Sequence, residues 1–312
     1  MKILLLDENH AIIKESLVKN DFEVVEDYFS SKNEIEKIIS NFDGIIIRSR
    51  FPIDKQFLSK ATNLKFIGRV GAGLENIDEV VAKEKNIKLF NAPEGNKDAL
   101  GEHAVGMLLL LLHRLKIADN EVRKGIWKRE ENRGDELMGK TVGIIGYGNM
   151  GKAFAKRLSG FGVNTICFDI EKNMGDENAR QVDLQTLFAQ TDILSIHTPL
   201  TKETTQMINS SFINRFKKPF YFINTARGKC VVTKDLVEAI KQEKIKGACL
   251  DVLEFEKSSF ENFFEQNMPD EFNFLIHSDK VVLSPHIAGW THQSKEKLAP
   301  FLVNKIVAYY QK

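Results

Sequence analysis

The chain has 312 residues, of which 43% are hydrophobic and 28% are charged, and its formal net charge is +1. This is an ordinary globular composition, with length enough for about two domains. Near-neutrality argues against a dedicated nucleic-acid-binding protein, which normally carries a basic excess, and against an acidic disordered chain.

Cysteine spacing and apolar runs narrow the class further. Cys167, Cys230 and Cys249 are far apart and form no CxxC pair, so we expect neither a disulfide framework nor a metal site. The longest apolar run, residues 104–112, is far shorter than the roughly 20 residues of a membrane span. The N-terminal residues lack the features of a secretory signal. We therefore expect a cytoplasmic protein without a membrane partner.

In the first third of the chain, short β-rich runs alternate with amphipathic helical patterns such as 34–39 and 77–85. Such alternation predicts a mostly parallel, doubly wound sheet. The predicted strands are 2–6, 23–25, 44–48, 65–70 and 88–91.

A single long helix is predicted next, over about residues 98–124. Its segment 104–112 is apolar on nearly every face and should be buried all round, against the next domain or a second subunit. The polar segment 125–137 follows and contains Trp127. Two interpretations stay open for it: a solvated loop, or an exchanged arm that anchors Trp127 on a partner subunit.

A second series of strands and helices then begins, and its six strands match two mononucleotide-binding halves. A helical tail, 294–310, comes after this second sheet is complete. If this tail returns to the first domain, that domain is discontinuous. The chain would then cross between the two domains twice, and these crossings would form a natural hinge. The predicted strands are 141–145, 165–168, 193–197, 221–224, 248–252 and 281–283.

The sharpest local signal is the sequence G-Y-G-N-M-G at 146–151, which follows a β-rich run and opens a helical one. Gly146 allows a tight turn, Gly148 lets the backbone approach a pyrophosphate, and Gly151 lets the helix pack close to the strand. The N–H groups at the helix start attract phosphate. The pattern predicts a dinucleotide site.

An acidic residue completes this pattern. Asp169 closes the next predicted strand, 18 residues after Gly151 and near the expected spacing of about 20. Its carboxylate can accept hydrogen bonds from the adenosine ribose hydroxyls and would repel a 2′-phosphate. We therefore expect the cofactor NAD rather than NADP.

Five motifs in order resemble the D-isomer-specific 2-hydroxyacid dehydrogenases. The resemblance implies an α/β fold of two doubly wound parallel-sheet domains. In it, a Rossmann NAD-binding domain, 98–289, is inserted into a flavodoxin-like substrate domain, 1–97 and 290–312, with the catalytic cleft between them. The motifs are R-V-G-A-G-L-E-N-I-D at 69–78, G-Y-G-N-M-G at 146–151, N-T-A-R-G at 224–228, L-D-V at 250–252 and S-P-H-I-A-G at 284–289.

The resemblance implies a catalytic set matched by Arg227, Glu256 and His286. A guanidinium can hold the substrate carboxylate and polarise the keto oxygen. Imidazole suits a step that gains and loses a proton near neutral pH. Glu256 would orient the imidazole, and the neighbouring Glu254 is the alternative partner.

Six other histidines are weaker candidates for the acid–base role. His197 ends a predicted strand and is a weak rival. The remaining five are expected to be packing or interface residues of the long helix (His103, His113) or surface residues (His10, His277, His292).

The resemblance also implies contacts to the cofactor and the substrate, with Asp251 near the nicotinamide ring. A small-residue turn at 70–73 would let backbone N–H groups approach a carboxylate. The expected cofactor residues are Gly146, Gly148, Asn149, Met150, Gly151, Asp169, Thr198, Pro199, Thr225, Ala226, Asp251 and Gly289. The expected substrate residues are Arg48, Ser49, Arg50, Gly71, Ala72, Gly73 and Arg227.

The sequence Arg48-Ser49-Arg50 suggests a substrate. In an extended chain, residues two apart face the same side, so both guanidiniums would grip one dianionic phosphate. The second arginine resembles phosphoglycerate dehydrogenases more narrowly, which implies oxidation of 3-phosphoglycerate to 3-phosphohydroxypyruvate in serine biosynthesis. The alternatives are a glyoxylate or hydroxypyruvate reductase and, in another class, an NAD-sensing dimeric scaffold. We expect a homodimer through the NAD-binding domain.

Overall fold

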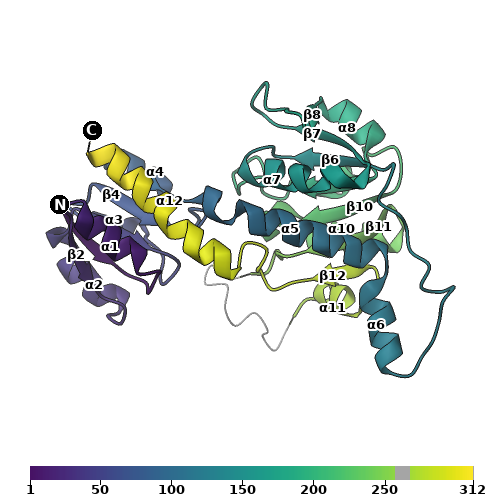
Figure 1. Ribbon diagram of the computed structural model, residues 1–312, viewed down its shortest axis with the longest axis horizontal. Helices are drawn as coiled ribbons and strands as arrows, with labels where there is room; N and C mark the ends of the chain where they lie inside the picture. The colour runs from purple at the N-terminus through teal and green to yellow at the C-terminus, as the bar shows by residue number, and fades with distance from the viewer. Residues whose placement is uncertain (257–267, 312) are drawn as a thin grey trace. The chain divides into compact units, whose positions relative to one another are not determined.

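A computed structural model of the protein describes residues 1–256 and 268–311 and divides the chain into two compact units (Figure 1). Within the described residues, unit 1 comprises Met1–Asn96 and 290–311, and unit 2 comprises Lys97–Glu256 and 268–289. Each unit contains one parallel sheet flanked by helices. The predicted α/β class, with two parallel sheets, is confirmed. No helix among the described residues has the length and apolarity to cross a membrane.

Unit 1 contains a five-stranded sheet in the order β2-β1-β3-β4-β5, the flavodoxin-like order. Both faces of the sheet are apolar. Successive residues of a strand point to opposite faces, so Ile3 packs in the hydrophobic cluster on one face and Leu4 in the cluster on the other. The strands are β1 (Lys2–Leu5), β2 (Glu23–Glu26), β3 (Gly44–Ile47), β4 (Phe66–Arg69) and β5 (Lys88–Phe90).

The helices of unit 1 cover both faces of its sheet. The C-terminal helix α12, yellow in Figure 1, packs beside α1, with Leu302 and Ile306 in the same cluster as Ile13 and Leu17. The helices are α1 (Ile12–Lys19), α2 (Lys32–Ile38), η1 (Ile39–Asn41), α3 (Lys55–Lys60), α4 (Glu79–Glu84) and α12 (His292–Tyr310).

Unit 2 contains a seven-stranded sheet in the order β12-β11-β10-β9-β6-β7-β8. Its order reverses at β6, which is the topological switch point of a Rossmann sheet, where ligands bind. The sequence missed β8, because a two-residue strand carries no periodic signal. The strands are β6 (Thr141–Ile145), β7 (Asn164–Phe168), β8 (Arg180–Gln181), β9 (Ile193–Ile196), β10 (Phe220–Asn224), β11 (Ile245–Leu250) and β12 (Val281–Leu283).

The predicted single helix over 98–124 is wrong. The structure has two helices there, because Arg114 adopts a left-handed conformation (φ 53°) that ends the first one. The predicted burial of residues 104–112 on all sides is also wrong for a single chain, since Gly106 is exposed and Leu109 and Leu110 are half-buried.

Helix α5 (Pro93–Leu112) belongs to unit 2 from Lys97 onward. The other helices of unit 2 are α6 (Leu115–Arg123), α7 (Asn149–Leu158), η2 (Ser159–Phe161), α8 (Leu184–Gln190), α9 (Ser210–Ile213), η3 (Gly228–Cys230), α10 (Thr233–Lys241) and α11 (Asp270–His277).

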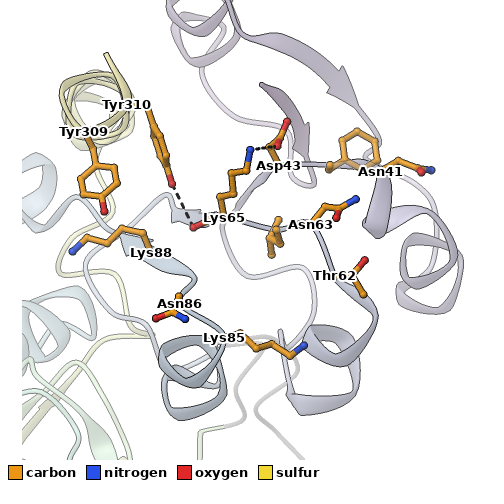
Figure 2. Close-up of a pocket in the computed structure, with 12 residues that line it drawn as sticks. Asn41, Asp43, Thr62, Asn63, Lys65, Lys85, Asn86, Lys88, Tyr309 and Tyr310 are labelled. Carbon is orange, nitrogen blue, oxygen red and sulfur yellow. Dashed lines mark hydrogen bonds and ion pairs between the residues drawn. The ribbon is translucent and has the colours of Figure 1, made fainter. Parts of the chain in front are cut away.

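A pocket of about 720 Å³ lies in unit 1, at the amino ends of β3, β4 and β5 (Figure 2). Lys65 and Asp43 form an ion pair there at 2.8 Å, and the Tyr310 hydroxyl lies 3.4 Å from the Lys65 carbonyl oxygen. None of the residues predicted for catalysis or binding lines this pocket. The carboxyl ends of the strands, at the opposite edge, are where open α/β sheets bind ligands.

Candidate active site

The glycine turn after β6 has the geometry of a phosphate cradle. Gly146 has φ 87°, and a Cβ there would lie 2.8 Å from the carbonyl carbon of His197. A Cβ on Gly151 would lie 2.3 Å from the Gly146 oxygen, so both positions require glycine. A Cβ on Gly148 would meet nothing within 4 Å, so the backbone of the turn is uncovered at this residue.

The start of α7 supplies donors to the same place. Gly148 is the N-cap of α7 and provides no side-chain hydrogen bond to the first turn. Backbone N–H groups at such a helix start attract a pyrophosphate. The turn and the helix together fit the phosphates of a dinucleotide.

Asp169 follows β7 and is bonded to the glycine turn. Its Oδ2 accepts the Tyr147 N–H at 2.7 Å, and its Oδ1 accepts the Glu171 N–H at 3.0 Å. An ionised carboxylate has about four acceptor positions, so it retains capacity for ribose hydroxyls. The Tyr147 side chain is fully buried, and its hydroxyl donates to Asp176 at 2.6 Å. This hydrogen bond anchors the glycine turn to the protein interior.

Further predicted cofactor residues follow β9 and β10. Thr198 and Pro199 come after β9, with the Thr198 hydroxyl 3.9 Å from the Cys230 sulfur. Thr225 comes directly after β10 and is 4% exposed. Its hydroxyl oxygen is buried and has no hydrogen-bond partner among the described residues. A buried orphan hydroxyl at this edge fits a cofactor that supplies the missing partner.

The turn that carries Arg227 is shaped by a buried amide. Asn224, at the end of β10, is fully buried; its Nδ2 donates to the Arg227 carbonyl at 3.0 Å, and its Oδ1 accepts the Ala226 N–H at 3.0 Å. The Arg227 guanidinium donates to the Ala226 carbonyl at 2.6 Å. Gly228 is needed because a Cβ would lie 1.9 Å from the Leu253 oxygen. The Arg227 turn and the segment after β11 are therefore neighbours.

Glu256 and His286 form a pair. The Nδ1 atom of His286 lies 2.8 Å from Oε2 of Glu256, and the other carboxylate oxygen accepts the Leu253 N–H. The two side chains are 28% and 17% exposed, so solvent reaches both only in part. His286 has φ 55°, a left-handed conformation rare for a residue with a side chain, so its surroundings must hold it.

The two glutamates at this position have different hydrogen-bond partners. Glu254 accepts the backbone N–H of Thr233 at 2.8 Å, at the start of α10. It therefore caps a helix, whereas Glu256 bonds the imidazole of His286. The sequence left both open because only two positions separate them.

Asp251 is 1% exposed and acts as the anchor of the loop after β12. Its Oδ1 accepts the Ser284 hydroxyl at 2.6 Å and the Ile287 N–H at 2.8 Å, and its Oδ2 accepts the Ala288 N–H at 3.0 Å. Burial by itself would raise the pKa of Asp251. The nearby His103 imidazole, together with hydrogen bonds from Ser284, Ala288 and Ile287, outweighs burial and holds the pKa of Asp251 below its usual value.

His197, the weak rival to His286, is not placed for acid–base chemistry. Its Nε2 lies 2.9 Å from the Ser195 hydroxyl and its ring packs 5.4 Å from that of Phe154. Burial lowers the pKa of His197 to about 3. Its imidazole is therefore neutral near pH 7.

In unit 1 the premise for a double-arginine phosphate site is wrong. β3 ends at Ile47, so Arg48, Ser49 and Arg50 follow in a bend and not in an extended chain. The Arg50 guanidinium donates to the carbonyl oxygens of Leu6 (2.8 Å), Asp27 (2.6 Å) and Ser30. Arg50 therefore ties together three backbone segments.

Arg48 and the small-residue turn are linked through a residue that the sequence reasoning did not single out. Arg69 Nε donates to the Arg48 carbonyl at 3.1 Å, and a Cβ on Gly71 would lie 1.7 Å from the Arg69 guanidinium. The Arg48 guanidinium lies 5.2 Å from the ring centre of Trp290. The Ala72 carbonyl accepts the Asn91 amide at 2.6 Å, and Gly73 continues the turn.

Comparisons with known proteins agree with this geometry. Residues 105–288, more than half of the chain, match the family model "D-isomer specific 2-hydroxyacid dehydrogenase, NAD binding domain". Hydroxypyruvate reductase from Thermotoga maritima is 36% identical over 289 residues, covering 92% of this chain and 91% of that protein. D-3-phosphoglycerate dehydrogenase from Archaeoglobus fulgidus is 34% identical over 310 residues, covering 98% of this chain but 57% of that protein.

A solved structure shows the same likeness. D-Lactate dehydrogenase from Aquifex aeolicus, complexed with NAD and lactic acid, superposes with a TM-score of 0.83 at 28% identity and covers 100% of this chain and 96% of that one. The predicted family and the predicted cofactor are confirmed. The chain belongs to the D-isomer-specific 2-hydroxyacid dehydrogenases, enzymes with an NAD-binding domain.

Proposed function

We propose that the protein interconverts a small 2-keto acid and the corresponding D-2-hydroxy acid, with His286 as proton donor and acceptor. The Glu256–His286 pair supports this proposal, because Glu256 holds the imidazole and belongs to the segment after β11, which neighbours the Arg227 turn at Leu253. NAD, when bound, accepts or supplies the hydride. The glycine turn, Asp169 and the buried Thr225 hydroxyl are the groups that would hold it.

His286 exchanges a proton with the substrate oxygen. Because Glu256 is bonded at Nδ1, the exchange takes place at Nε2. In the oxidation direction Nε2 takes the hydroxyl proton, and the Glu256 carboxylate stabilises the resulting imidazolium. In the reduction direction the same nitrogen returns the proton to the oxygen.

Arg227 binds the substrate in this proposal. Its guanidinium can hold a carboxylate through two parallel hydrogen bonds and polarise the keto oxygen. The buried Asn224 fixes the backbone on both sides of the Arg227 turn. The side chain is therefore presented from a rigid support.

For the substrate we propose an unphosphorylated acid of the hydroxypyruvate or glyoxylate type. Arg50 supports this choice, since three backbone carbonyls occupy its guanidinium in place of a phosphate. The Thermotoga relative, a hydroxypyruvate reductase, supports it too. The second candidate is 3-phosphoglycerate, favoured by Arg48 and by the Archaeoglobus relative, and it would place the protein in serine biosynthesis.

The direct test is a panel of acids with purified protein, followed by NADH absorbance. Hydroxypyruvate and glyoxylate should be reduced with a higher kcat/KM than 3-phosphohydroxypyruvate. A preference for the phosphorylated acid would select the second candidate. Absence of turnover on every acid would reject the enzyme proposal and favour the NAD-sensing scaffold.

We also propose a homodimer formed through unit 2. Apolar side chains of α6 and the following segment are exposed in the single chain, including Trp127 at 78% and Leu115 at 51%. Large apolar side chains that are exposed in a single chain are often covered at a protein interface. Sedimentation should give twice the chain mass, and Trp127→Ser should shift the species toward monomer. A wild-type protein that sediments as a monomer at high concentration would contradict the proposal.

A further inference from the structure

His103 lies on α5 and reaches the edge of the sheet where Asp251 and Ser284 follow β11 and β12. Its Nε2 is 3.0 Å from the Ser284 hydroxyl oxygen and 3.5 Å from Oδ1 of Asp251. The His103 side chain is 23% exposed, so the cluster is largely shielded from water. Three segments that are distant in sequence thus meet at one buried carboxylate.

The direction of the hydrogen bonds can be worked out from the donors present. The Ser284 hydroxyl has one proton and lies 2.6 Å from the Asp251 carboxylate, which only accepts when ionised. The serine oxygen is then the acceptor for His103. Nε2 of His103 must therefore carry a hydrogen. A series of hydrogen bonds then runs from His103 through Ser284 to Asp251.

This series of hydrogen bonds continues from Asp251 to the backbone around His286. The Asp251 carboxylate accepts the N–H groups of Ile287 and Ala288, and its backbone carbonyl accepts the N–H of His286 at 2.8 Å. These bonds constrain the three consecutive residues that include His286. A left-handed residue persists only where such constraints over-determine it.

We propose that His103 is a positioning residue for the reaction: through Ser284 it fixes the Asp251 carboxylate that holds the His286 loop. The inference rests on the proposed role of His286. It gives a function to a histidine that the sequence alone assigns to helix packing. If the His103–Ser284 hydrogen bond served only to fix α5 to the sheet, its removal would leave the His286 loop unchanged.

Hydrogen exchange tests the inference without cofactor or substrate. His103→Leu removes the donor at similar volume, and exchange at the Ile287 and Ala288 amides should become about 10-fold faster as their shared acceptor loosens. His103→Gln keeps an N–H donor and should stay within about threefold of the wild type. His113→Leu, at an exposed histidine just after the same helix, is the matched control and should change neither amide.

Kinetics on the acid that the wild type turns over best provide the second readout. His103→Leu should lower kcat by about 10- to 100-fold with KM within about threefold, because misplacement of a proton donor affects the chemical step. His103→Gln should restore kcat. Ser284→Ala should resemble His103→Leu, and the double variant should lose no more than the worse single variant, since both act through one chain.

Unchanged exchange and unchanged kcat in His103→Leu would overturn the inference. So would a His103→Gln variant as impaired as His103→Leu, or losses that multiply in the double variant. A wild type without turnover would instead reject the proposed function, and the exchange rates would still decide whether His103 holds the loop.

Discussion

The two units present polar side chains at the same edge of similar parallel sheets, but they hold them differently. In unit 2 the buried Asp251 and Asn224 use their own side chains to shape the loops that carry His286 and Arg227. In unit 1 backbone carbonyls hold the Arg50 guanidinium. The residues that we propose for proton transfer and anion binding in unit 2 thus stand on loops fixed by buried side chains, whereas Arg50 ties together backbone segments of unit 1. Substitutions in unit 2 should affect kcat and cofactor binding, and those at Arg50 should affect stability.

The largest expected effect is at His286. His286→Asn removes the proton donor, and kcat should fall by about 100- to 10,000-fold, the usual contribution of general acid–base catalysis. NADH binding, measured by titration calorimetry, should stay within about threefold, since the glycine turn is untouched. Retention of more than a tenth of the wild-type kcat would rule out the proposed role.

A smaller effect is expected at the glycine turn. Gly148→Ala adds a methyl group that meets no protein atom within 4 Å, so the melting temperature should hardly change. The same methyl group would crowd the pyrophosphate, and the Kd for NADH should rise by about 10-fold. Gly160→Ala is the matched control, because its Cβ also meets nothing within 4 Å. Equal NADH affinity in both variants would contradict the placement of the cofactor at this turn.

Arg50 tests the other side of the comparison. Arg50→Ala leaves the Leu6, Asp27 and Ser30 carbonyls without this donor and should lower the free energy of unfolding by about 1–3 kcal/mol. Activity on phosphorylated and unphosphorylated acids should fall by similar factors. A selective loss with the phosphorylated acid would instead restore the double-arginine phosphate site. Denaturant unfolding and the same panel of acids measure both quantities.

The last prediction concerns acid stability, an effect that is absent at neutral pH. The pKa of His197 is about 3 in the folded protein and near 6.5 when unfolded, so between these values the unfolded state binds the extra proton. Stability should therefore fall as pH drops below 6.5, by at most about 1.4 kcal/mol per unit from this group. His197→Phe should flatten the dependence of unfolding free energy on pH from 6.5 to 4. An unchanged slope would show that His197 is not the group responsible.

Much of the fold was predictable because apolar runs and turn residues mark parallel strands locally. The break between α5 and α6 was not, because Arg114 is neither the glycine nor the asparagine that usually marks a left-handed residue. The two-residue β8 was missed for lack of periodicity.

The candidate site was predictable where motifs are contiguous and uncertain where geometry decides. The resemblance favoured Glu256, with Glu254 as the alternative, but which carboxylate turns toward His286 depends on side-chain geometry that the sequence does not show. The extended geometry assumed for Arg48 and Arg50 was wrong because β3 ends before them. His103 was missed because Ser284, its partner, lies 181 positions away.

The central claim is that Glu256 holds His286 for proton transfer, and the comparison of Glu256→Gln with Glu254→Gln tests it most directly. Steady-state kcat of both variants would be measured with the preferred 2-keto acid and NADH. We predict a loss of about 10-fold or more in Glu256→Gln and less than about threefold in Glu254→Gln, since only the first removes the charge beside the imidazole. Equal kcat values in the two variants, or a larger loss in Glu254→Gln, would contradict the account.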